Sequence, residues 1–113
     1  MTYNTYYLKF SSEEEMKTVF ETLNWIKTSP IQIEGHSDKS EDLKRGDPNQ
    51  QGWQLSVNRS YNILKFLVEG AEFPKHHISM AGFGDAVPLA SNESPEGRRK
   101  NRRVEIAVIT PDQ

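Results

Sequence analysis

Two residues of opposite charge, Asp38 and Arg59, could together hold a ligand that carries both an ammonium and a carboxylate. Asp38 follows the carboxyl end of a predicted strand, and Arg59 lies in the first turns of the helix predicted next along the chain. A strand end and the start of the following helix can meet across the loop between them. There the guanidinium can grip a carboxylate through two parallel hydrogen bonds, while the aspartate accepts from the ammonium.

Each of these residues also has a simpler interpretation. Aspartate is common in turns, so Asp38 could be a turn residue. Arg59 could be a solvated helix residue or the partner of a structural carboxylate. His36 follows a glycine at the strand end and is expected to be a packed, hydrogen-bonded structural residue rather than a ligand-binding one. The residues alone leave these alternatives open.

The residue types and their spacing give little support for a metal site or for nucleophilic catalysis. The chain has no cysteine, which excludes disulfides, thiolate metal sites and thiol catalysis. His76 and His77 are adjacent and would point to opposite faces of a strand, so we expect no metal and no other cofactor. The run His36-Ser37-Asp38 contains the residue types of a hydrolase triad, but neighbours in an extended chain face apart. We therefore expect the chain not to be an enzyme.

The hydrophobic pattern predicts an α+β fold with the order β-α-β-α-β-β. Aromatic or alternating segments predict strands over residues 6–10, 31–34, 77–81 and 103–109. Apolar residues at helical spacing predict helices over residues 12–27 and 53–69. Polar loops are predicted over 36–52 and up to about residue 97. Two main helices packed on one face of a four-stranded mixed sheet, a two-layer sandwich, would bury this pattern.

Length and charge set further bounds. The 113 residues fit a single domain over 1–113, and the net charge of −2 does not draw the chain toward nucleic acid or anionic lipid. The first residues carry neither a basic nor an apolar export signal. If the protein works outside the cytoplasm, we therefore expect this chain to be a fragment of a longer one, with its signal or anchor upstream.

The segment from Arg98 to Arg103 contains five cations in six residues and could bind nucleic-acid phosphates. The following residues alternate as a strand, so successive arginines are expected to point to opposite faces rather than form one patch. No aromatic platform for stacked bases accompanies them. We therefore expect no nucleic-acid partner and favour pairing with acidic residues.

Four segments carry a resemblance to a known family. They are Gly35-His36-Ser37-Asp38, Leu55-Ser56-x-x-Arg59, Gly82-Phe83-Gly84-Asp85 and Asn101-Arg102-Arg103-Val104-Glu105. Together they resemble the OmpA-like peptidoglycan-binding family, whose patterns G-H-[ST]-D, N-x-x-L-S-x-x-R, G-[YF]-G-[ED] and N-R-R-V-E occur in this order. The likeness covers nearly the whole chain, up to about residue 109.

The resemblance implies a non-catalytic domain that binds peptidoglycan non-covalently. It also implies that the ligand is the diaminopimelate of the stem peptide, whose end carries both an ammonium and a carboxylate. The family pattern implies that Asp38 and Arg59 contact this group. It adds Arg102, Leu55 and Asn101 to the peptidoglycan-binding site.

Residues 52–56 and 94–98 are most similar to the MotB branch of the family, the periplasmic part of flagellar motor stators. This implies a periplasmic domain attached to a membrane through a region absent from this chain. It also implies a homodimer in the full-length protein and a membrane ion-channel subunit as partner. The alternative is a general tether between the outer membrane and the cell wall. Gly52 replaces the family asparagine, whose contact is lost or supplied by Asn49 or Gln51.

Overall fold

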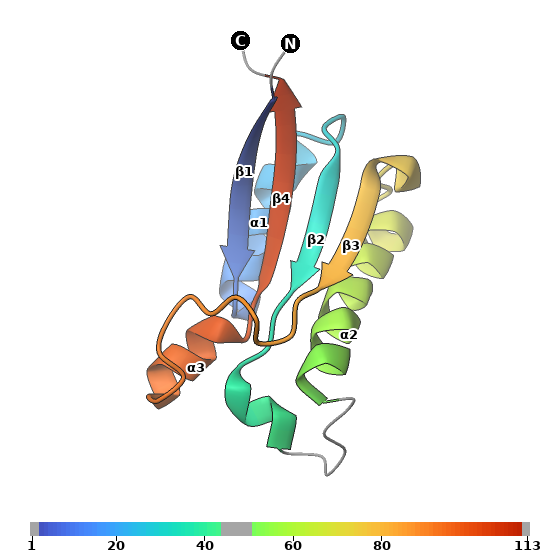
Figure 1. Ribbon diagram of the computed structural model, residues 1–113. Coiled ribbons are helices and arrows are strands. Elements are labelled where there is room, and N and C mark those ends of the chain that lie inside the picture. Colours follow the sequence, from blue (N-terminus) through green and yellow to red (C-terminus); the bar gives the residue numbers. More distant parts are fainter. Residues whose placement is uncertain (1–2, 44–50, 112–113) are drawn as a thin grey trace.

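A four-stranded mixed sheet forms one layer of the structure, with the strand order β1-β4-β2-β3 (Figure 1). The computed structural model describes residues 3–43 and 51–111. The strands are β1 (Tyr3–Phe10), β2 (Ile31–Gly35), β3 (Ile78–Gly82) and β4 (Val104–Pro111). β4 runs antiparallel to both β1 and β2, whereas β2 and β3 are parallel. The predicted α+β fold with a mixed sheet is confirmed.

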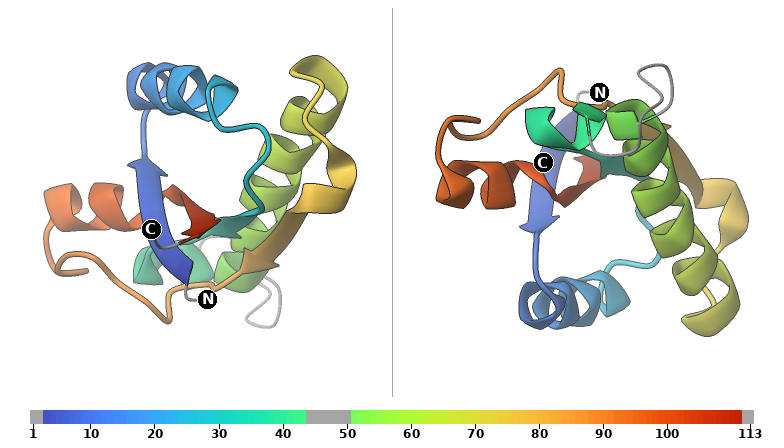
Figure 2. Two further views of the ribbon diagram at one scale, coloured as in Figure 1. Left: turned by 90° about the horizontal axis from the view of Figure 1, so that it is seen from above. Right: turned by 90° about the horizontal axis from the view of Figure 1, so that it is seen from below.

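Two main helices, α1 (Glu13–Asn24) and α2 (Gln51–Lys65), pack on the same face of this sheet (Figure 2). A single turn of π-helix, Phe66–Gly70, extends α2. Short 3-10 helices lie at Lys39–Leu43 and Lys75–His77. The buried core takes alternate residues from the strands, two residues from α1, one from the π-helical turn and one from the loop after it: Phe10, Val19, Leu23, Ile31, Ile33, Leu67, Phe73, Val104, Ile106 and Val108. Within residues 3–43 and 51–111, no helix combines the length and apolar character that a membrane crossing requires.

The start of α1 is fixed by capping residues. Ser12 is the N-cap, and its hydroxyl accepts from the backbone N–H of Glu15 at 3.2 Å. The Glu15 carboxylate in turn accepts from the backbone N–H of Ser11 at 3.1 Å. This reciprocal pair satisfies N–H groups that a helix start leaves free. It also sets the direction in which the chain turns from β1 into α1.

Close contact between β2 and α2 depends on Gly35, the last residue of β2. A Cβ atom at this position would lie 1.8 Å from the backbone oxygen of Ser56 in α2. Only glycine lets the two backbones approach this closely. The contact places the segment that follows β2 beside the first turns of α2, where Arg59 lies.

A third helix, α3 (Pro95–Asn101), replaces the predicted loop before the last strand. The Ser94 hydroxyl caps it by accepting from the Gly97 N–H at 2.9 Å, and Pro95 occupies the first helical turn. Its seven residues carry no apolar stripe, so hydrophobic periodicity could not reveal it, although the Ser-Pro start could have. The expectation that the basic run alternates along a strand is therefore wrong for Arg98, Arg99 and Lys100, which lie on α3.

Candidate functional site

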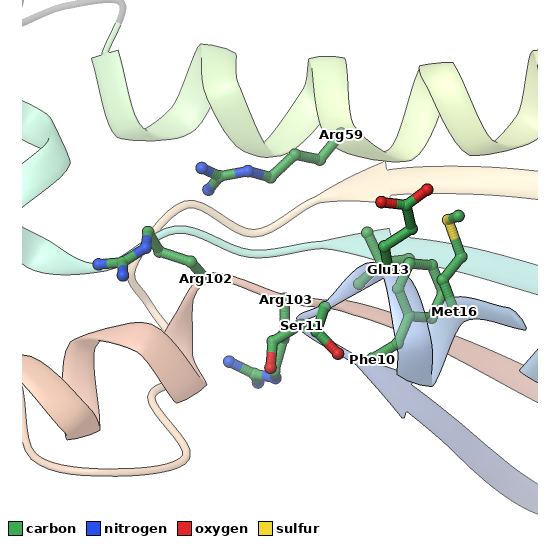
Figure 3. A pocket seen from close by; sticks show the side chains of 9 residues that line it. Phe10, Ser11, Glu13, Met16, Arg59, Arg102 and Arg103 are labelled. Carbon is green, nitrogen blue, oxygen red and sulfur yellow. The ribbon is translucent and has the colours of Figure 1, made fainter. Parts of the chain in front are cut away.

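A cavity of about 310 Å³ opens between the start of α1, α2 and the start of β4 (Figure 3). Arg59 reaches it from α2, Arg102 from the junction of α3 and β4, and Glu13 from the first turn of α1. The full lining comprises Phe10, Ser11, Ser12, Glu13, Met16, Arg59, Arg102, Arg103 and Val104. The cavity thus offers guanidinium groups and a carboxylate on walls that are otherwise partly apolar.

Arg59 is bound to a carboxylate of its own chain. Its Nη1 and Nη2 donate to Oε1 and Oε2 of Glu41 at 2.9 and 2.6 Å, in the bidentate geometry. Nη1 also donates to the backbone oxygen of His36 at 2.9 Å. Glu41 is only 5% exposed, while the Arg59 side chain keeps 28% of its surface open. The alternative that Arg59 partners a structural carboxylate is thus what the structure shows.

Asp38 forms a second ion pair beside the first. Its side chain is fully buried, and Oδ2 accepts from Nη1 of Arg102 at 2.7 Å. Oδ1 accepts from the backbone N–H of Ser40 at 2.7 Å and from the Ser40 hydroxyl. Burial by itself would raise the pKa of Asp38, but the hydrogen bonds from Ser40 and Arg102 outweigh it and lower the pKa. Asp38 is therefore a charged residue that holds Arg102 in place.

The two ion pairs meet at one point. The backbone N–H of Asp38 donates to Oε1 of Glu41 at 2.9 Å, so Asp38 and Arg59 contact the same carboxylate. The strand end and the following helix bring these two residues together, as their places in the chain predict. Each of the two charged side chains also has a partner within the chain, Arg102 for Asp38 and Glu41 for Arg59. Glu41 was missed because the predicted loop gave no sign of its helical turn.

The remaining predicted site residues lie outside the cavity lining. Asn101 is fully buried, its Oδ1 accepting from the N–H groups of Leu89 and Ala90 at 2.7 and 2.9 Å, and its Nδ2 donating to the oxygen of Ala90 at 2.9 Å. It therefore fixes the loop before α3. Leu55 is half-buried on α2. Of the candidates to replace the family asparagine, Asn49 and the side chain of Gln51 lie outside the described part of the chain.

Arg103 also lines the cavity, but its guanidinium is buried and hydrogen-bonded within the chain. It is 3% exposed, and its Nε donates to Glu105. Its Nη2 donates to the backbone oxygen of Val87 at 2.8 Å, and Nη1 to that of Asn101 at 3.3 Å. Arg102 is different, since 34% of its side chain is exposed. Arg102 is therefore the better placed of the two neighbours to bind an anion.

His36 packs beneath the site as a neutral ring. It is 2% exposed and stacks on Phe83 with the ring centroids 5.2 Å apart. The expected packing is present, but within the described residues neither ring nitrogen has a hydrogen-bond partner. Burial, followed by the charge of Arg103, lowers the pKa of His36 from 6.5 to about 4, against the opposing effect of Glu105.

This shift predicts a pH-dependent stability. Between pH 6.5 and about 4 the unfolded chain binds a proton at His36 that the folded chain does not. The contribution of His36 to the free energy of unfolding is therefore expected to be complete above pH 6.5. It should fall on acidification, by roughly 3 kcal/mol at pH 4. Urea unfolding between pH 4 and 8 measures it.

A His36→Gln variant is the control for this prediction. Glu34, whose pKa is raised by burial and by Glu105, contributes stability below its unfolded pKa that is lost as pH rises, which opposes the histidine effect. Asp38 contributes stability above its unfolded pKa that is lost at still lower pH. Both carboxylates stay in the variant, so the difference between the two proteins isolates the imidazole. Parallel pH curves would contradict the prediction.

Residues 2–102 match the family described as the OmpA family. Motility protein B of Bacillus subtilis is 35% identical over 100 residues, which cover 86% of this chain and 38% of that protein. The peptidoglycan-binding protein ArfA of Mycobacterium tuberculosis is 46% identical over 54 residues, 48% of this chain and 16% of that protein. The chain thus spans well under half the length of these relatives.

Solved structures are similar over most of the chain. The C-terminal domain of Helicobacter pylori MotB matches with a TM-score of 0.71 and 26% identity over 90% of this chain and 77% of that one. The cell wall anchor of the type VI secretion system (T6SS) from Pseudomonas aeruginosa matches with a TM-score of 0.68 and 27% identity, over 88% of this chain and 69% of that one. The family match covers well over half of the chain, from residue 2 to residue 102, and the chain belongs to the OmpA family.

Proposed function

We propose that this domain binds peptidoglycan non-covalently, with the diaminopimelate of the stem peptide in the cavity beside Arg59 and Arg102. The observation that supports it is that two partly exposed arginines, Arg59 and Arg102, and the carboxylate of Glu13 line the same cavity of about 310 Å³. The free end of diaminopimelate carries a carboxylate and an ammonium on one carbon. Its carboxylate suits the arginines, and its ammonium suits a carboxylate.

The proposed roles differ among the charged residues. A guanidinium has five N–H donors, and among the residues that the structure describes the side chain of Arg102 makes one hydrogen bond, to Asp38. The remaining donors of Arg102 can take the ligand carboxylate. The main role of Asp38 is to orient Arg102. A direct contact between Asp38 and the ligand ammonium stays a prediction, and it requires Oδ2 to accept from both Arg102 and the ammonium. Glu13, exposed on the cavity wall, is the other candidate for the ammonium.

For the biological role we propose wall attachment of a flagellar motor stator, as the relatives named for MotB suggest. The domain would then be non-catalytic and periplasmic. It would be joined to a membrane-embedded ion-channel complex through a region outside this chain, as part of a homodimer. A second candidate is anchoring of another envelope protein, because ArfA and the T6SS cell wall anchor are also similar. An upstream membrane span carrying an aspartate would favour the motor, and a lipid-attachment signal the tether.

Co-sedimentation with purified sacculi tests the binding function. We expect the domain to pellet with walls that contain diaminopimelate and to be released by free diaminopimelate. Walls with lysine in its place are the matched control, because lysine lacks the terminal carboxylate that the arginines would bind. Equal pelleting with both walls would contradict the ligand assignment. Failure to pellet would reject the binding function, and release of soluble fragments would favour a hydrolase.

A further inference from the structure

The carboxylate of Glu41 occupies a complete binding site for a carboxylate. Three N–H donors converge on it: Nη1 and Nη2 of Arg59 at 2.9 and 2.6 Å, and the backbone N–H of Asp38 at 2.9 Å. Two of these donors form the planar fork that matches a carboxylate, and the third adds a fixed direction. Any ligand carboxylate that seeks Arg59 meets a site that is already filled.

We propose that Glu41 is an internal competitor whose carboxylate holds the position that a ligand carboxylate takes, so that Glu41 sets the affinity and selectivity of the cavity. This inference rests on the proposed function, because it concerns the same arginine and the same class of ligand. It assigns a role to a residue that neither the sequence motifs nor the family pattern marks.

The positions of the two partners make an exchange feasible. Arg59 lines the cavity and keeps 28% of its side chain open, so a ligand can reach the guanidinium from the cavity. Glu41 contacts it from the 3-10 helix Lys39–Leu43. The Glu41 backbone is held separately, through its N–H to the Asp38 oxygen at 3.2 Å. The carboxylate can therefore leave by side-chain rotation while this turn stays in place.

Replacing the Glu41 carboxylate with a ligand carboxylate should change the binding free energy little, and this makes the cavity selective. One carboxylate replaces another on the same donors, so the gain from the ligand is offset by the loss of Glu41. A ligand with a carboxylate alone would gain little. A ligand that also presents an ammonium gains a second contact, which the internal carboxylate cannot match. The cavity is thereby selective for zwitterionic ends over simple acids.

Binding of free meso-diaminopimelate to Glu41→Gln, measured by isothermal titration calorimetry, tests the proposal. Glutamine keeps the size of the side chain but removes the charge, so we expect the Kd to fall about tenfold. The diamide of diaminopimelate, which keeps both ammonium groups but has no free carboxylate, is the matched ligand, and its Kd should not change. Glu93→Gln, which removes one exposed charge from the loop before α3, should bind both ligands as the parent does.

Glu41→Asp separates competition from simple charge removal. It keeps the negative charge but shortens the side chain, so competition predicts a lower Kd, whereas a general charge effect predicts the parent value. Thermal unfolding of each variant verifies the fold. An equal or higher Kd for Glu41→Gln with the free acid would overturn the inference and leave the proposed function standing. If neither the parent nor the variants bound diaminopimelate or sacculi, the proposed function would fail and this inference with it.

Discussion

Replacing Arg59 with lysine is expected to weaken binding to sacculi by at least about tenfold in Kd, which corresponds to about 1.4 kcal/mol. Lysine keeps the positive charge on the cavity wall but loses the planar fork that takes a carboxylate through two parallel bonds. Quantitative co-sedimentation at constant ionic strength measures the change. Arg99→Lys is the matched control, because Arg99 is exposed on α3 and does not line the cavity.

Lysine is preferred to alanine at this position for a structural reason. Arg59→Ala would leave the buried carboxylate of Glu41 without its charged partner, at a cost of about 3–5 kcal/mol. Loss of binding in that variant could then reflect unfolding instead of a lost contact. Parent-like Kd values for Arg59→Lys in a folded protein would show that the guanidinium fork does not contact the wall ligand.

A large loss of stability is expected from Gly35→Ala. The added methyl group would lie 1.8 Å from the backbone oxygen of Ser56, and backbone cannot rotate away as a side chain can. β2 and α2 must separate to accept it, which should lower the free energy of unfolding by at least about 3 kcal/mol. Chemical denaturation measures it, and binding should fall as well, because the same contact sets Arg59 beside residues 36–38.

Gly70→Ala provides the matched control for that prediction. A Cβ at Gly70 would meet only the ring of Phe66, at 3.5 Å, which is an ordinary van der Waals contact. We expect its unfolding free energy to stay within about 1 kcal/mol of the parent. Equal stability of the two variants would mean that the approach of β2 to α2 is not as tight as described.

Much of the fold was predictable because its signals are local. Alternation along Ile31–Gly35 and the capping residues before α1 each specify one element through nearest neighbours in the sequence. α3 lacked such a signal in its hydrophobic pattern, because Pro95–Asn101 contains no apolar stripe. The local signals that its sequence does carry are the Ser94 cap and Pro95 in the first turn.

For the candidate site, the sequence predicted which residues lie near one another but not which of them form ion pairs. Topology brings Asp38 and Arg59 together, but which acid pairs with which arginine depends on one helical turn that rotates Glu41 into the Arg59 fork. Such a turn leaves no pattern in a polar loop. For Asn101, the ligand contact stays a prediction, and the structure shows a second role, hydrogen bonds to the backbone of the loop around Ala90.

The pairing of β1 with β4 has a mechanical consequence. Their register runs from Tyr3 opposite Pro111, the first and last described residues, to Phe10 opposite Val104 at the other end, where the cavity lies (Figure 1). Tension between these two ends acts along the strands, at right angles to their hydrogen bonds. The hydrogen bonds between β1 and β4 are then loaded together in shear and do not break one after another.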